Sequence, residues 1–247
     1  MKENNIKTHC IGTPELGISY SLRMGSYTLS RLVKDNLHLD LEQHTSEANV
    51  VILIRDTIDR MRSGYWHQMQ WAFDPYLTHK FNNKIIQHDF SRAMELAHFK
   101  NGGWFNEAGK RKYASVDCWV RGVTLGPDEL EGTVGGWVDL NLKELSKFDN
   151  FWFLDLKDLC NPKFLEWLQE KDSGWEKVNE IKYQGANRTP NWFWPQMDIF
   201  WSEYNAGKVL KDKTLINPFE NSDVLDRAIA EQKNVDFIRK HARYINL

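Results

Sequence analysis

The stretch NVVILIRDTIDRMRSGYW, residues 49–66, decides the fold that this sequence predicts. It opens on the continuous apolar run VVILI, which is typical of a strand buried on both faces of a parallel sheet. Beyond Thr57 the apolar residues recur at helical spacing, as Ile58, Met61, Tyr65 and Met69. A helix should therefore begin near Thr57. A buried strand that leads at once into a helix indicates the α/β class.

A second strand-to-helix pattern precedes this stretch. Ile18, Tyr20 and Leu22 alternate with serines, which predicts a half-buried strand. A short loop of small residues follows, and apolar residues resume at helical spacing from Leu29. We expect the ends of both strands to lie at one edge of the sheet, where ligands of α/β folds bind.

Two more patterns follow nearer the C-terminus. The run NFWFLDLKDL, residues 150–159, predicts a strand, and the next helix is expected to have Asn161 as its cap and Pro162 in its first turn. A last helix is expected over residues 222–245, with an inward face formed by Leu225, Ile229 and Phe237. Alternating strands and helices predict a three-layer α/β fold, a mainly parallel β-sheet flanked by helices.

The chain organisation indicates a single domain over residues 1–247, because no linker, repeat or low-complexity tract divides it. The polar residues 1–16 are expected to form an N-terminal arm. A glycine-rich stretch at about 100–140 is expected to be an irregular insertion on the side where an acceptor would bind.

Composition excludes several classes of protein. The 32 Lys and Arg against 34 Asp and Glu give a net charge of −2, which argues against a nucleic-acid binder. Three widely spaced cysteines make no disulfide framework, so a reducing, cytoplasmic location is expected. No stretch has the features of a signal peptide or the length of a membrane span, and no cluster of residues suggests a metal site.

Two segments could hold phosphate groups, and a third only imitates one. GTPELGIS, residues 12–19, has the glycine spacing of a Walker A loop but lacks its lysine and precedes the strand, so we exclude it. In RMGSYTL, residues 23–29, Gly25 would let an anion approach the amides of the helix start, with Arg23 adding charge. An ordinary capped helix after a turn remains an alternative for this segment.

The second phosphate segment lies within the opening stretch. Arg55 ends the buried strand, and Ser63 follows eight residues later on the helix. Two separate phosphate-binding segments imply a nucleotide that carries phosphates at two places. The pattern of Arg55, Asp56, Arg60, Ser63 and Tyr65 resembles the Arg-Asp-Pro-x-x-Arg-x-x-Ser-x-Tyr motif of sulfotransferases that use 3′-phosphoadenosine 5′-phosphosulfate (PAPS).

The resemblance implies a fold, a reaction and a set of residues. The fold would be the P-loop NTPase-like sulfotransferase fold, and the reaction would move a sulfuryl group from PAPS to a hydroxyl or amine of a carbohydrate or small-molecule acceptor. Arg55 and Ser63 would hold the 3′-phosphate. The 5′-phosphosulfate loop would comprise the residues Arg23, Met24, Gly25, Ser26, Tyr27, Thr28 and Leu29.

The resemblance also implies the catalytic residues, which are Arg23 in the first phosphate segment and a general base between the two segments. Arg23 stands where the family usually has a lysine, and it would stabilise the leaving adenosine 3′,5′-bisphosphate. The general base should be a His or Glu within reach of the acceptor hydroxyl, and its place in the family implies His38, Glu42 or His44. The segment LHLDLEQH alternates apolar and polar residues, so it should be extended.

Three other functions stay open. A relative that has lost turnover could bind adenosine 3′,5′-bisphosphate or a glycan, and the replacement of lysine by Arg23 favours this reading. A kinase-like P-loop enzyme would bind ATP with magnesium. The eleven tryptophans could belong to a carbohydrate-binding module, among them the stacking candidates Trp104, Trp119, Trp137, Trp192 and Trp194, or could simply fill the core. The expected partner is a small molecule or glycan, with no nucleic acid and no membrane.

Overall fold

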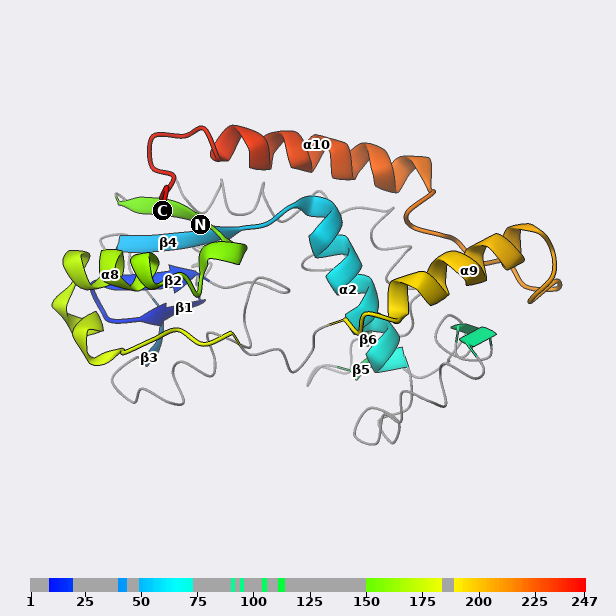
Figure 1. The fold of residues 1–247 in the computed structure, drawn as a ribbon, viewed down its shortest axis with the longest axis horizontal. Coiled ribbons are helices and arrows are strands. Elements are labelled where there is room, and N and C mark those ends of the chain that lie inside the picture. Colours follow the sequence, from blue (N-terminus) through cyan, green and yellow to red (C-terminus); the bar gives the residue numbers. More distant parts are fainter. Residues whose placement is uncertain are drawn as a thin grey trace, which may run out of the picture. The chain divides into compact units, whose positions relative to one another are not determined.

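A computed structural model describes two compact units (Figure 1). The described residues are 9–19, 40–43, 49–72, 90–91, 94–95, 104–105, 111–113, 150–183 and 189–247. Unit 1 comprises Met1–Arg60, Gly136–Ala186 and Ala230–Leu247, and unit 2 comprises Met61–Gly135 and Asn187–Ile229. The single domain expected over residues 1–247 stays a prediction.

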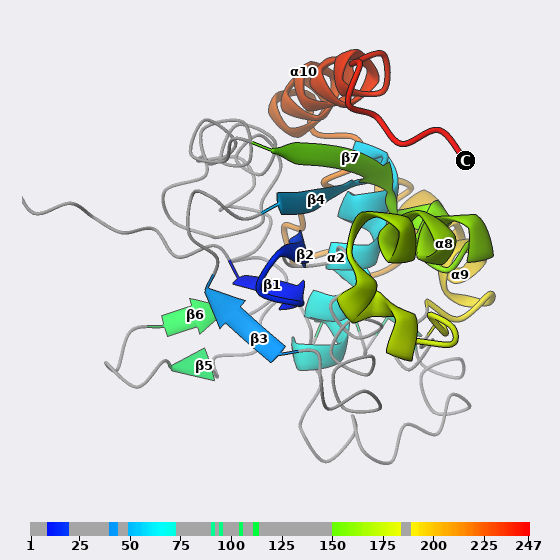
Figure 2. The same cartoon turned by 90° about the vertical axis from the view of Figure 1, so that its left-hand side faces the viewer.

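Unit 1 is built on a five-stranded sheet with the strand order β3-β1-β2-β4-β7 (Figure 2). The strands β2, β4 and β7 are parallel, whereas β1 is antiparallel to both β2 and β3. Their bounds are β1 His9–Gly12, β2 Leu16–Ser19, β3 Asp40–Gln43, β4 Asn49–Ile54 and β7 Phe151–Asp155. The α/β class is confirmed, and the sheet is mixed.

The expectation of a mainly parallel sheet was wrong because of the hairpin between β1 and β2. Strand β1 lies inside residues 1–16, where an arm was expected, and the tight turn at Thr13 can join only antiparallel strands. Thr13 N–H donates to the Leu16 carbonyl at 3.1 Å, and the Leu16 N–H donates to Thr13 Oγ1 at 3.0 Å. The Walker-like stretch is therefore strand, turn and strand, which confirms its exclusion as a phosphate loop.

Glycine is required at position 12 by a close approach of two backbones. Gly12 pairs with Gly17 across the hairpin, and a Cβ at Gly12 would lie 2.3 Å from the Leu16 carbonyl oxygen. The same Cβ would lie 3.0 Å from the ring of Trp175. The hairpin can therefore close against this ring only without a side chain there.

The strand β4 forms the centre of the parallel part of the sheet, as the apolar run predicts. It pairs with β2 on one side and β7 on the other, and its residues from Val50 to Ile54 are at most 4% exposed. The helix α2, Thr57–Ala72, begins where the change in spacing predicts. Residues 57–60 of this helix belong to unit 1 and the remainder to unit 2.

The two faces of β7 contact different elements of unit 1. Trp152 meets Trp167 of helix α8, Pro162–Lys171, edge to face at 5.2 Å, whereas Phe153 meets His241 at 5.8 Å on the opposite face. Asn161 caps α8 by accepting the Lys163 N–H at 3.1 Å, which confirms the predicted helix start. Two short 3-10 helices, η1 Leu156–Asp158 and η2 Ser173–Lys177, flank α8.

Unit 2 has a core rich in aromatic residues. Helix α9, Phe193–Asn205, packs its buried residues against those of α2, and the rings of Trp66 and Phe193 lie 4.6 Å apart. Helix α10, Ser222–Ile238, begins in this unit, and its residues from Ala230 onward belong to unit 1. Two short antiparallel strands, β5 Trp104–Phe105 and β6 Arg111–Tyr113, lie in the stretch expected to be irregular.

Candidate functional site

Arg55 lies at the carboxyl edge of the parallel strands. It directly follows β4, and the strand register brings the ends of β2 at Ser19 and β7 at Asp155 to the same edge. Arg55 is partly buried, and this burial lowers the pKa of its guanidinium, which the nearby Asp59 carboxylate partly counteracts. An arginine keeps its charge under such conditions, so this edge carries a fixed cation.

The start of α2 is tied to α10. The Asp56 carboxylate accepts hydrogen bonds from Arg239 Nη1 at 2.9 Å and Gln232 Nε2 at 3.1 Å. The Thr57 N–H donates to Gln232 Oε1 at 2.9 Å. The hydrogen bond from Arg239 also lowers the pKa of Asp56. These contacts fix the backbone that directly follows Arg55.

One hydroxyl beside Arg55 is buried. Thr57 is fully buried, and its Oγ1 has no hydrogen-bond partner within the described part of the chain. Ser63 lies on the second turn of α2 and is partly buried. Arg55 thus directly follows β4, and Ser63 lies on α2, whereas their joint role in a phosphate site stays a prediction.

Most of the other predicted site residues lie outside the described residues. These are Arg23, Met24, Gly25, Ser26, Tyr27, Thr28, Leu29, His38 and His44. The backbone of Glu42 is described, and it pairs with Cys10 in β3, so this part of the expected extended segment is confirmed. Strands β1 and β2 separate β3 from β4, which places the Glu42 backbone roughly 14 Å from β4 at the usual strand spacing.

Arg60, the second arginine of the motif, forms a buried ion pair. Its Nη2 lies 2.9 Å and 3.1 Å from the two carboxylate oxygens of Glu231 on α10, and each side chain is 2% exposed. A buried charge needs a partner of this kind, because burial alone would favour its neutral form. The structure therefore gives Arg60 a stabilising role in unit 1.

A cluster around Asp155 holds the end of β7, and the sequence analysis missed it. Arg239 donates from Nε and Nη2 to the two oxygens of the buried Asp155 carboxylate, at 2.9 Å and 2.8 Å. The Tyr244 hydroxyl donates to the same carboxylate at 2.9 Å. These residues lie 84 and 89 positions from Asp155, so no local spacing could reveal them. The sequence feature that could have indicated this cluster is Asp155 itself, an aspartate at the end of a strand predicted to be buried.

The Tyr244 hydroxyl should make unit 1 sensitive to alkaline pH. Burial, and then the bond to the Asp155 carboxylate, raise the pKa of Tyr244 to about 12, whereas an unfolded tyrosine titrates at about 10. Because the folded pKa is the higher one, this stabilisation is complete below pH about 10 and is lost as pH rises toward about 12.

The variant Tyr244→Phe removes this titration, and urea unfolding across the alkaline range measures it. The stability of the wild type should fall toward that of the variant as pH rises. Tyr65, whose pKa burial also raises, is present in both proteins and cancels in the comparison. Parallel stability curves for the two proteins would contradict the role of Tyr244.

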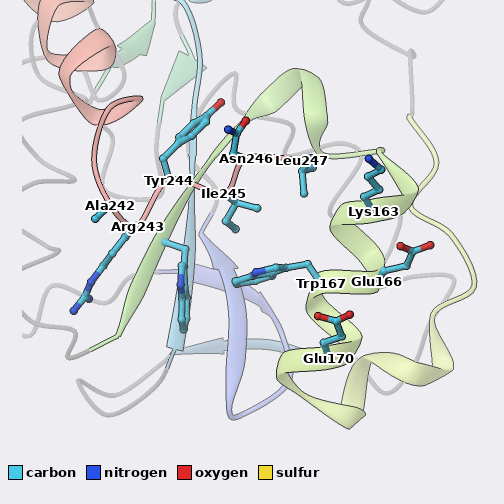
Figure 3. Close-up of a pocket in the computed structure, with 11 residues that line it drawn as sticks. Lys163, Glu166, Trp167, Glu170, Ala242, Arg243, Tyr244, Ile245, Asn246 and Leu247 are labelled. Atoms are coloured by element: carbon cyan, nitrogen blue, oxygen red, sulfur yellow. The ribbon is translucent and has the colours of Figure 1, made fainter.

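Unit 1 has a surface pocket of about 520 Å³ (Figure 3). Its lining includes Trp152, Trp167 and the three charged residues Lys163, Glu166 and Glu170, which α8 presents along one side. The ammonium of Lys171 lies 6.0 Å and 5.8 Å from the two tryptophan ring centroids. Of the predicted site residues whose side chains the structure describes, neither Arg55 nor Ser63 lines this pocket.

Comparison with family models, with curated proteins and with solved structures gave no match. In the described ranges, no three metal-ligating side chains gather into a group that could hold an ion. Within the same part of the chain, none of the helices has the length and apolar character to cross a membrane. The resemblance to sulfotransferases thus stays a prediction from the motifs.

Proposed function

We propose that this chain is a PAPS-dependent sulfotransferase with the P-loop NTPase-like sulfotransferase fold, acting in the cytoplasm. The observation that carries the proposal is the position of Arg55, directly at the carboxyl end of the central parallel strand β4. Ser63 follows on the adjoining helix at the spacing of the 3′-phosphate motif. A fixed cation followed by a hydroxyl at this edge suits a dianionic phosphate.

In the proposed reaction, an acceptor oxygen or nitrogen attacks the sulfur of PAPS. The bond between sulfur and the 5′-phosphate oxygen breaks, and adenosine 3′,5′-bisphosphate leaves. Arg23 and the amides of residues 25–28 would stabilise the charge that develops on the leaving phosphate. The acceptor proton would pass to His38, Glu42 or His44. The acceptor would be a carbohydrate or another small molecule.

A second candidate is a protein that binds adenosine 3′,5′-bisphosphate without turnover. The observation that favours it is Arg23, because a planar guanidinium does not replace the point charge of the family's usual lysine. Transfer of labelled sulfate from PAPS to a panel of hydroxyl acceptors separates the two. Binding of the bisphosphate without any transfer would leave only the second candidate.

The nucleotide site itself is tested by titration calorimetry with adenosine 3′,5′-bisphosphate. We expect metal-independent binding, weakened by about 10- to 100-fold in Arg55→Ala, because a charge-assisted hydrogen bond contributes about 1.5–3 kcal/mol. Ser63→Ala should weaken binding by about fivefold, through the loss of one neutral donor.

Two matched variants serve as controls. Arg62→Ala removes an exposed arginine from the same helix, and Ser173→Ala removes an exposed serine from η2. Both should bind the bisphosphate as the wild type does. Unchanged affinity in both Arg55→Ala and Ser63→Ala would overturn the motif assignment. A preference for ATP with magnesium would indicate the kinase-like enzyme instead.

A further inference from the structure

Unit 2 contains a pocket of about 280 Å³, and neither Arg55 nor Ser63 is among its described lining residues. We propose that it binds a single neutral or amino sugar ring. The pocket lies along α9 and is closed by Arg62 of α2 and by the turn at residues 217–220. Its remaining lining residues are Trp194, Met197, Asp198, Trp201, Ser202 and Asn205.

The sequence of α9 places these side chains on one face of the helix. Lining positions recur every three or four residues from Trp194 to Asn205, which is the spacing of a single helical face. Met197 and Trp201 are buried at 1% and 6% exposure, and they form an apolar base. Asp198 and Ser202, each one residue further on, are exposed and provide polar groups at the mouth.

The aromatic wall of the pocket is held in place from two sides. The Arg62 guanidinium lies 5.2 Å from the centroid of the Trp194 ring, and Phe219 meets the same ring edge-on at 5.3 Å. The first is a cation–π contact and the second an edge-to-face aromatic contact, and both restrict the ring. The Trp194 ring is therefore a preorganised surface.

The polar rim is partly ordered before any ligand binds. Asn217 Oδ1 accepts the Phe219 N–H at 3.1 Å, which shapes the turn. Asn205 Nδ2 donates to Glu220 Oε2 at 3.5 Å and joins the end of α9 to this turn. The amides, hydroxyl and guanidinium can donate hydrogen bonds, and the two carboxylates can accept them.

This combination of groups selects a sugar ring over other ligands. A sugar hydroxyl both donates and accepts hydrogen bonds, and the C–H faces of the ring suit an apolar, aromatic base. Among the described lining residues, the two carboxylates of Asp198 and Glu220 outnumber the cation Arg62, so an anionic ligand would be repelled. The volume lies at the small end for ligand pockets, which suits one ring. The inference concerns unit 2 alone and does not depend on the proposed sulfuryl transfer.

The test is saturation-transfer-difference NMR on the full chain with three probes in turn: D-galactose, N-acetyl-D-glucosamine and D-glucosamine. We expect saturation of the ring C–H protons of at least one probe. Asp198→Asn should raise the dissociation constant of that probe by about fivefold or more, because it removes a charged acceptor. Asp212→Asn neutralises another exposed aspartate of unit 2, outside the pocket, and should leave the dissociation constant unchanged.

A further variant separates this pocket from the one in unit 1. Trp167→Ala alters the pocket of Figure 3 and should leave sugar binding intact. The absence of saturation transfer to all three probes would overturn the proposal. Loss of sugar binding in Trp167→Ala, with full binding in Asp198→Asn, would also overturn it, because the sugar would then occupy the other pocket.

Discussion

Glu231→Ala should lower the free energy of unfolding by about 3–5 kcal/mol, because it leaves the Arg60 guanidinium buried without the carboxylate opposite. Both side chains are 2% exposed, and two hydrogen bonds of 2.9 Å and 3.1 Å join them. Arg60→Met should cost a comparable amount, since the carboxylate of Glu231 then remains buried. Urea unfolding of each variant measures the change.

The double variant Arg60→Met with Glu231→Leu gives the sharper comparison. Replacing both charges by apolar side chains should recover most of the loss, because no charge then stays buried alone. Glu166→Ala, at an exposed position of α8, is the matched control and should stay within about 0.5 kcal/mol of wild type. Strictly additive effects in the double variant would show that Arg60 and Glu231 stabilise the fold independently.

Trp175→Ala should lower the free energy of unfolding by about 3–5 kcal/mol through the cavity that it leaves. Trp175 is fully buried, its ring contacts Gly12, and its Nε1 donates to the Leu16 carbonyl at 3.2 Å. The substitution therefore removes core packing and also leaves a buried carbonyl short of one donor.

Two variants separate the loss of core packing from the loss of the hydrogen bond and from the effect of ring size. Trp175→Phe keeps most of the ring volume and removes the donor, so its cost should be smaller than that of Trp175→Ala. Trp167→Ala removes an equally large but only partly buried ring from α8 and should also cost less. If Trp167→Ala destabilised the protein as much as Trp175→Ala in urea unfolding, burial of Trp175 would not be the cause.

Local patterns predicted those parts of the fold that local chemistry determines. The apolar run gave β4, the change of spacing gave the start of α2 at Thr57, and the Asn161-Pro162 pair gave the start of α8. The antiparallel strand β1 was missed because its pairing depends on a turn hidden in a motif that resembles a phosphate loop. The order of strands in the sheet likewise depends on contacts between distant residues.

The inward face of α10 was predicted wrongly, because it contains a buried charged residue. The large apolar residues Ile229 and Phe237 were expected to face inward, yet they are 54% and 70% exposed. The buried residues are Val224, Ala228, Glu231, Val235 and Ile238. Glu231 interrupts the row of buried apolar residues on α10, because it forms an ion pair with Arg60. The sequence of the buried face is therefore only weakly amphipathic. Ile58 of α2 is likewise exposed, at 38%.

The residues of the candidate site also fall into two groups, those positioned by local sequence and those positioned by contacts between distant segments. Arg55 and Ser63 could be placed from sequence, because a strand and the helix directly after it fix their positions. Asp155 and its partners Arg239 and Tyr244 could not, because their contacts form only when distant segments meet. The pocket on α9 depends on both kinds of information. Its helical face follows from the spacing of residues along α9, whereas the contribution of Arg62 depends on a contact with α2.

Unit 1 is formed by three separate segments of the chain, so its fold cannot be completed on the ribosome until the last segment has emerged. Residues 230–247 supply Glu231, Arg239 and the segment that bonds to Phe153 through the Arg243 carbonyl and the Ile245 N–H. Until these residues have emerged, Arg60 and Asp155 lack these charged partners, and one edge of the nascent sheet stays uncovered. Such late, long-range closure slows folding and prolongs exposure of strand edges. We therefore expect this chain to rely on chaperones until residues 230–247 have emerged.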